Sequence, residues 1–160
     1  MICATKFHRI TENEMTRLKC LLASAVLAFT LTACADERKD NISAAEAFAL
    51  AEAGEITLID IRRPEEWRQT GVAKGVNTIN MLHPQGMGGF AREVYATVGH
   101  DLDAPIVLIC RTGNRTSRLQ PILTEMGFTN VRHVPEGMVG SRAGPGWIAR
   151  GLPVEACRVC

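Results

Sequence analysis

The strongest constraint on the fold is an apolar run, Ile106-Val-Leu-Ile109, that follows Pro105 and passes directly into Cys110. A continuous apolar run rich in β-branched residues predicts a strand that is buried on both faces. Such strands are typical of the middle of a parallel sheet. We therefore expect the segment 105–109 to form a central strand, with Cys110 at its carboxyl end.

Segments of helix and strand character alternate along the chain. Ser43-Ala-Ala-Glu46 has the pattern of a capping box ahead of a helix, which Gly54 can stop. Alternation of this kind predicts an α/β fold, in which a central, mostly parallel sheet is flanked by helices on both faces. The other predicted elements are a strand over 56–61, a short helical turn over 63–67, a strand over 76–80, a loop over 83–89, helices over 90–98 and 116–126, a strand over 131–134 and a helical turn near Trp147.

The N-terminal segment has the pattern of a secretory signal peptide. Arg17 and Lys19 precede an apolar run over residues 20–31, which is too short to span a bilayer. We predict a signal peptide over 1–33, with translation starting at Met1 or at Met15, then a charged tether over 34–40 and one domain over 41–156. The last residues, 157–160, form a C-x-x-C tail.

The end of this leader, Leu31-Thr-Ala-Cys34, resembles the lipobox of bacterial lipoproteins. The resemblance implies that Cys34 is the lipidated first residue of the mature protein. The protein would then be anchored to a membrane on the periplasmic side of the cell envelope. A plain signal peptide, which would give a soluble periplasmic protein, and a buried N-terminal helix are the alternatives.

Charge and cysteine content exclude several classes of protein. The formal net charge is +1, and no basic stripe or aromatic-rich basic segment predicts binding to nucleic acid. Half of the six cysteines lie in the leader region, so a disulfide framework is not expected. The spacing of a zinc site is also absent, and we expect neither a metal nor a cofactor.

The loop that follows the central strand, Cys110-Arg-Thr-Gly-Asn-Arg115, carries the expected chemistry. A loop that enters a helix N-terminus points backbone N–H groups and a positive dipole at one place. Gly113 allows a tight curl, and Arg111 and Arg115 add permanent positive charge. Such surroundings favour a thiolate, so we predict that Cys110 is a nucleophile. A buried structural cysteine is the alternative.

The loop resembles the C-x-x-G-x-R active loop of rhodanese domains, and four further motifs agree in order. These are Asp60-Ile-Arg62 with Glu65-Glu66-Trp67, Gly71-Val-Ala-Lys-Gly-Val76, Gly127-Phe128 followed by Val131, and Trp147 with Gly151-Leu-Pro-Val154. The resemblance implies a rhodanese-like three-layer fold and a sulfurtransferase. Departures are Val72 in place of a histidine, Pro121 within a helix, a long stretch over 81–89, and Glu136-Gly137-Met138 in place of paired glycines.

Membership in that family implies that Cys110 takes sulfane sulfur from a small anionic donor such as thiosulfate and passes it to cyanide or a thiol. Arg111, Thr112, Gly113, Asn114 and Arg115 would bind the substrate, with Arg115 also shaping the loop. Asp60 and Arg62 would brace the loop through an ion pair. Four residues separate Cys110 from Arg115, whereas the related phosphatases have five, so the resemblance favours sulfur over phosphate.

The C-terminal pair, Cys157 and Cys160, has two interpretations. It is either a disulfide without a catalytic role, or a redox dithiol that takes part in transfer. The alternative functions are a persulfide carrier or partner-binding module with little turnover, and a thiol–disulfide redox protein that uses this pair.

Overall fold

The computed structural model describes residues 41–157 and residue 160. A four-stranded parallel sheet in the order β3-β1-β4-β5 forms its centre. The strand predicted to be central, β4, lies between two others, which confirms that prediction. The strands are β1 (Thr57–Asp60), β3 (Asn77–Thr78), β4 (Ile106–Ile109) and β5 (Val131–His133).

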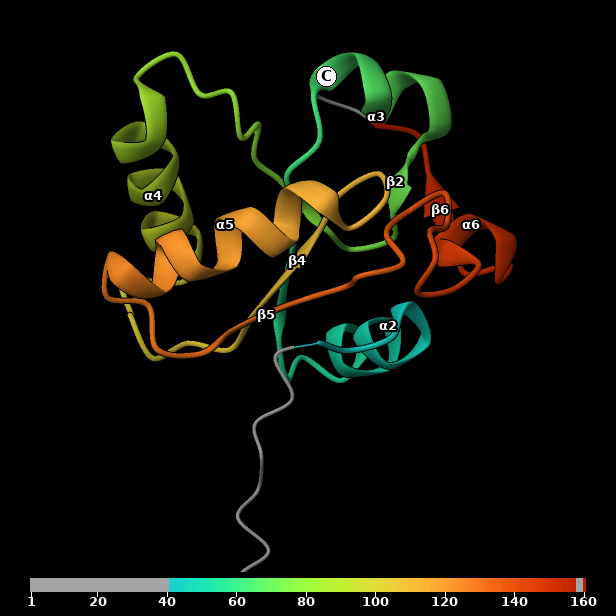
Figure 1. The fold of residues 1–160 in the computed structure, drawn as a ribbon, viewed down its shortest axis with the longest axis horizontal. Helices are drawn as coiled ribbons and strands as arrows, with labels where there is room; N and C mark the ends of the chain where they lie inside the picture. Colours follow the sequence, from blue (N-terminus) through green and yellow to red (C-terminus); the bar gives the residue numbers. More distant parts are fainter. Residues whose placement is uncertain (1–40, 158–159) are drawn as a thin grey trace, which may run out of the picture. The chain divides into compact units, whose positions relative to one another are not determined.

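Helices cover both faces of this sheet. α4 (Gly86–Thr97) and α5 (Asn114–Glu125) pack on one face, and α2 (Ala44–Glu52) and α6 (Gly146–Ala149) pack on the other (Figure 1). Side chains of β4 alternate between the two cores, and all four are fully buried. Each such side chain contributes about 1.5–3 kcal/mol through its burial. The predicted three-layer α/β fold is confirmed.

The first described helix, α2, is capped both locally and from a distance. The Ser43 hydroxyl accepts the N–H of Glu46 at 3.1 Å, as the local pattern predicts. The carboxylate of Glu136 accepts the N–H of Ala44 at 2.7 Å. Burial raises the pKa of Glu136, but bonds from Arg150 and from backbone N–H groups outweigh burial and lower it. No local sequence signal predicts this second cap.

A small second sheet lies apart from the first. β2 (Val72–Ala73) and β6 (Val154–Glu155) pair antiparallel after α3 (Pro64–Thr70), which runs three residues beyond its predicted end. Neither strand was predicted. Two-residue strands carry no periodic pattern, so their pairing depends on the tertiary structure.

The prediction of a loop over 83–89 is wrong in its second half, because α4 begins at Gly86. The His83 ring lies against the first turn of α4, where its Nδ1 accepts the N–H of Gln85 at 3.0 Å. A Cβ on Gly89 would lie 2.2 Å from the same Nδ1. Gly89 therefore allows a close contact with an imidazole ring.

The helix after Cys110 also begins earlier than predicted, at Asn114, and it continues through Pro121. Within residues 41–157, no helix combines the length and the apolar character needed to cross a membrane. The predicted signal peptide, the tether and Cys34 lie outside the described residues.

Candidate active site

Cys110 lies where β4 ends and the loop into α5 begins. Its side chain belongs to the core between the sheet and helices α4 and α5, and only 1% of the residue is exposed. The Sγ atom lies 3.8 Å from the Oγ1 atom of Thr116, in the first turn of α5. Ligand sites of open parallel sheets form at the carboxyl ends of strands. The structure therefore places the predicted nucleophile where such a site is expected.

One side of the loop is held by the segment that follows β5. The N–H of Met138 donates to the carbonyl of Cys110 at 2.9 Å, and the N–H of Val139 donates to the carbonyl of Arg111 at 3.0 Å. These bonds fix two consecutive carbonyl groups at the start of the loop. Main-chain hydrogen bonds thus position the first half of the loop.

Two glycines let these segments approach closely. Gly113 has φ +81°, and a Cβ there would lie 2.0 Å from the carbonyl oxygen of Pro135. Gly137 has φ +64°, and a Cβ there would lie 2.5 Å from the carbonyl oxygen of Arg111. A side chain at either position would overlap the opposing backbone. The sequence pattern showed Gly137 only as part of a departure from the family, and the structure gives it this steric role.

The other side of the loop is held by charge. Both oxygens of Glu66, on α3, accept hydrogen bonds of 2.6 Å from the guanidinium of Arg115. The Glu66 carboxylate also accepts the N–H of Arg63 at 3.0 Å. The guanidinium predicted to bind substrate is therefore engaged within the protein.

The charges of this pair stabilise each other. Burial alone would raise the pKa of Glu66, but the bonds from Arg115 and Arg63 and nearby positive charge lower it to about 2. The hydrogen bonds to Glu66 raise the pKa of Arg115 against the effect of its burial, and negative charge on Cys110 and Asp60 adds to this rise. The thiol and the ion pair thus share one electrostatic environment.

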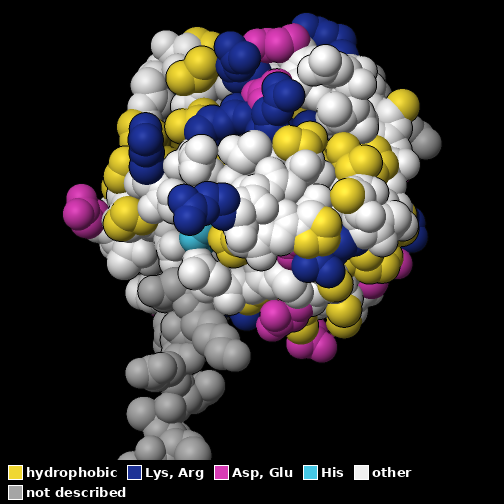
Figure 2. All heavy atoms as spheres, turned by 45° about the vertical axis from the view of Figure 1, so that its right-hand side comes forward, with side chains coloured by type: hydrophobic (Ala, Val, Ile, Leu, Met, Phe, Trp, Pro, Cys, Tyr) yellow, Lys and Arg dark blue, Asp and Glu magenta, His cyan; other side chains and the backbone are white. Residues whose placement is uncertain are grey.

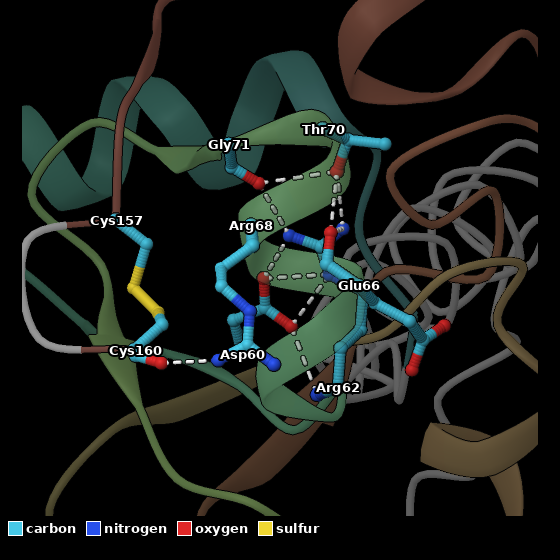
Figure 3. The surroundings of a disulfide bond; sticks show 8 residues. All are labelled: Asp60, Arg62, Glu66, Arg68, Thr70, Gly71, Cys157 and Cys160. Atoms are coloured by element: carbon cyan, nitrogen blue, oxygen red, sulfur yellow. Dashed lines mark hydrogen bonds and ion pairs between the residues drawn. A yellow bond between two sulfur atoms is a disulfide. The ribbon is translucent and has the colours of Figure 1, made fainter.

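Asp60 and Arg62 form a fully buried ion pair at 2.7 Å. Other guanidinium contacts of Arg62 run to the Glu66 carbonyl at 3.4 Å, the Thr70 hydroxyl at 2.7 Å and the Gly71 carbonyl at 2.8 Å (Figure 3). We expected this pair to brace the Cys110 loop. These hydrogen bonds fix α3 and the turn into β2, and Asp60 acts on Arg115 through its charge.

The remaining predicted binding residues differ in exposure. Arg111 and Asn114 are exposed and Thr112 is half-buried. Figure 2 shows Lys and Arg side chains, with acidic side chains among them, on the upper part of the face drawn. Within the loop, the exposed side chain of Arg111 offers positive charge to an approaching anion.

Two hollows flank the loop. The first, of about 340 Å³, lies beside the ion pair and is lined by Arg63, Glu66, Met81, Leu82 and Arg115. The second, of about 490 Å³, is mainly polar in its side chains. It is lined by Thr112, Gly113, Asn114, Ser117, His133, Pro135, Gly140, Ser141, Arg142 and Ala143.

Sequence reasoning missed the roles of Glu66, Thr116 and His133. Glu66 belongs to the Glu65-Glu66-Trp67 motif, but its partner Arg115 lies 49 residues away in the sequence. Thr116 follows Arg115 directly, so its position at the helix start was the only local signal. His133 was not assigned a partner, and its Nδ1 lies 3.0 Å from the Thr116 hydroxyl.

Cys157 and Cys160 form a disulfide in the structure. The carbonyl oxygen of Cys160 contacts the guanidinium of Arg68, on α3 (Figure 3). The structure has the pair in the oxidised form, and a part for it in sulfur transfer stays a prediction. Within residues 41–157, no group of three His, Cys, Asp or Glu side chains is arranged to hold a metal ion.

A known protein family matches most of the described residues. The model of the rhodanese-like domain matches residues 43–143, which span β1 to β5 and the whole Cys110 loop. Among curated proteins, the thiosulfate sulfurtransferase GlpE of Pseudomonas syringae is 30% identical over 92 residues. That alignment covers 58% of this chain and 76% of GlpE.

Other similar proteins include one without a stated activity. The uncharacterized protein RP600 of Rickettsia prowazekii is 26% identical over 98 residues, which are 60% of this chain and 80% of RP600. Among solved structures, the polysulfide-sulfur transferase homodimer of Wolinella succinogenes is 25% identical, with a TM-score of 0.56. The match covers 90% of this chain and 93% of that one.

Proposed function

This chain belongs to the rhodanese-like domain family, and on that premise we propose that it is a sulfurtransferase that carries sulfane sulfur as a persulfide on Cys110. One observation carries the proposal. Cys110 is the one free cysteine among the described residues, and it lies at the carboxyl end of the central strand beside the first turn of α5. That place suits a nucleophile that acts on an anion.

The reaction is a pair of displacements at sulfur. The Cys110 thiolate attacks the outer sulfur of a donor such as thiosulfate, a new S–S bond forms, and the donor's S–S bond breaks. Sulfite leaves with the electron pair of that bond. Cyanide or a thiolate acceptor then attacks the outer sulfur of the persulfide, and the Cys110 thiolate is released again.

The residues around the thiol divide this work. Arg111 is exposed, and its charge would attract an anionic donor. The N-terminus of α5, at Asn114, favours negative charge on the bound sulfur. Arg115 would shape the loop, because Glu66 holds both of its terminal nitrogens. Gly113 would allow the backbone of Pro135 to approach the loop closely, and Thr112 lines the polar hollow.

The donor class is proposed from two supports. One relative is named a thiosulfate sulfurtransferase and one structural neighbour a polysulfide-sulfur transferase, and both compounds contain sulfane sulfur. The four-residue spacing from Cys110 to Arg115 favours a ring that fits sulfur rather than phosphate. We therefore propose a small sulfane-sulfur anion as donor, and cyanide or a thiol as acceptor.

The experiment measures thiosulfate-dependent formation of thiocyanate from cyanide by the full chain. Cys110→Ala should abolish it, because the nucleophile is absent. The matched control is the double variant Cys157→Ser with Cys160→Ser, which should keep the activity. Equal turnover by Cys110→Ala would refute the proposal, and loss of activity only in the double variant would favour a thiol–disulfide redox protein.

The burial of Cys110 favours a second candidate, a persulfide carrier with little turnover. A thiol that is only 1% exposed can retain a bound sulfur against exchange with small thiols. Intact-mass measurement after incubation with thiosulfate would then show one added sulfur that persists when cyanide is supplied. Rapid loss of that sulfur to cyanide would favour the enzyme.

We also propose that Cys34 carries lipid and anchors the protein on the periplasmic side of the envelope. The support is the Leu31-Thr-Ala-Cys34 pattern after the apolar run. Intact mass of protein from the membrane fraction should show acyl chains, and Cys34→Ala should release the chain from that fraction. An unmodified mass with release into the periplasm would favour the soluble alternative.

A further inference from the structure

A series of three buried polar groups starts at the thiol of Cys110 and ends at the hollow that Thr112 and Gly113 also line. The Sγ atom lies 3.8 Å from the Thr116 hydroxyl, and that hydroxyl lies 3.0 Å from Nδ1 of His133. The three residues are 1%, 0% and 6% exposed, respectively. They come from the end of β4, the first turn of α5 and the end of β5.

The Thr116 hydroxyl is suited to pass a proton along this series. A hydroxyl has one hydrogen to donate and two lone pairs with which to accept. Its hydrogen can be given to the carbonyl of Gly113, at 2.9 Å, or to Nδ1 of His133. When the hydroxyl donates to Nδ1, its oxygen lone pairs can accept from other donors. The S–H of Cys110, with Sγ at 3.8 Å, can be such a donor.

His133 links this buried series to solvent. Although mostly buried, it lines the polar hollow of about 490 Å³. Beside it lie the apolar Leu108 of β4 and Asn41 ahead of α2. The charged residue of that hollow is Arg142, which is exposed, so water screens its effect on a protonated ring. The ring thus borders the hollow while Cys110 stays enclosed.

We propose that His133 acts through Thr116 to accept the proton of the Cys110 thiol, so that the nucleophile forms as a thiolate paired with an imidazolium. The inference rests on the proposed function, because it concerns the same nucleophile. The S–H proton passes to Oγ1 of Thr116 as the hydroxyl proton passes to Nδ1 of His133. No electron is exchanged with a redox partner, and the hydroxyl is regenerated. His133 is thus a positioning residue that acts through another.

The test measures alkylation of Cys110 by iodoacetamide as a function of pH, with the full chain and mass analysis of the Cys110 peptide. His133→Asn keeps a polar atom near Thr116 but cannot accept the proton. We expect alkylation about tenfold slower at neutral pH, with the rise of the rate displaced to higher pH, as for the loss of a nearby opposite charge. Thr116→Val should give the same change, and the double variant should be no slower than either single variant.

Two matched controls separate the relay from packing. Thr116→Ser keeps the hydroxyl and should keep the parental pH profile. His100→Asn alters a histidine that does not belong to the three polar groups, and it should also keep that profile. An unchanged profile in His133→Asn would overturn the inference, as would additive losses in the double variant. If His133→Asn does not fold, as judged by circular dichroism, the comparison of Thr116→Val with Thr116→Ser decides.

Failure of this inference differs from failure of the proposed function. Alkylation needs no sulfur donor, so a displaced profile without thiosulfate turnover would support the relay and refute the transferase. Normal turnover with unchanged alkylation in His133→Asn would refute the relay and leave the transferase intact.

Discussion

Different kinds of interaction hold the two sides of the Cys110 loop. On the α3 side, the support is one charge pair, Glu66 with Arg115. On the side of the segment after β5, the support is main-chain hydrogen bonding and the absence of two side chains, at Gly113 and Gly137. The first support joins side chains that ionise, whereas the second depends on space and on backbone groups that do not titrate.

The two sides should therefore respond differently to mutation and to solution conditions. A charge pair weakens gradually when a partner is neutralised or when salt screens it. A close backbone contact has no intermediate state, because an added Cβ at 2.0 Å from a carbonyl oxygen must displace one segment. We expect the steric side to be the more sensitive to mutation and the charged side to be the more sensitive to solution conditions.

The largest effect is expected from Gly113→Ala. It adds a clash with Pro135 to an unfavourable positive φ, and we expect a loss of about 4 kcal/mol in the free energy of unfolding. Gly75→Ala is the matched control, because Gly75 has φ +73° and nothing within 4 Å of its Cβ position. It should cost about 1 kcal/mol. Urea denaturation measures both free energies of unfolding. Equal losses would show that the contact with the Pro135 backbone does not contribute to the cost.

Glu66→Gln should have the next largest effect. It leaves the partly buried guanidinium of Arg115 without a charged partner, so we expect a loss of about 2 kcal/mol in the free energy of unfolding. The control is Glu52→Gln, which breaks the exposed pair with Lys74 and should cost less than about 0.5 kcal/mol. Similar losses for the two variants would contradict the assignment of Glu66 as the main support on this side.

Acid should weaken the charged side alone. The pKa of Glu66 is lowered from 4.5 to about 2 in the folded protein, so its stabilising contribution is complete above pH 4.5. It is lost as pH falls from 4.5 through about 2. The difference in unfolding free energy between the parent and Glu66→Gln should therefore shrink over that range. Denaturation at several pH values measures it, and a constant difference would refute the prediction.

The smallest effect is expected from removal of the C-terminal disulfide. Cys157 and Cys160 close a short loop, so their loss should lower the free energy of unfolding by about 1–2 kcal/mol. The turn of α3 near Glu66 stays fixed by Arg62, so the pH response of the loop should not change. Denaturation of the double serine variant across the same pH range checks this, and an altered response would show that the disulfide supports the loop.

Local sequence was sufficient for the main elements and for the position of Cys110 at the end of the central strand. The apolar run 106–109 predicted a central strand, and the alternation of elements predicted the layered fold. Local sequence was insufficient for the start of α4 and for the pairing of the short strands. α4 begins within a glycine-rich stretch whose Gly89 lies against His83, and β2 pairs with β6 only because residues 154–155 return to the segment after α3. The Asp60–Arg62 pair was expected at the loop, and its contacts lie at the end of α3.

Neighbouring residues encode the position of Cys110 between a buried strand and a helix start, so the local pattern was enough to locate it. Packing of the layers sets which carboxylate pairs with Arg115, which backbone approaches Gly113, and which imidazole meets Thr116. Each of those contacts joins segments that are distant in the chain. Their strength depends on the burial and geometry that arise only when the layers pack, so no local pattern specifies them.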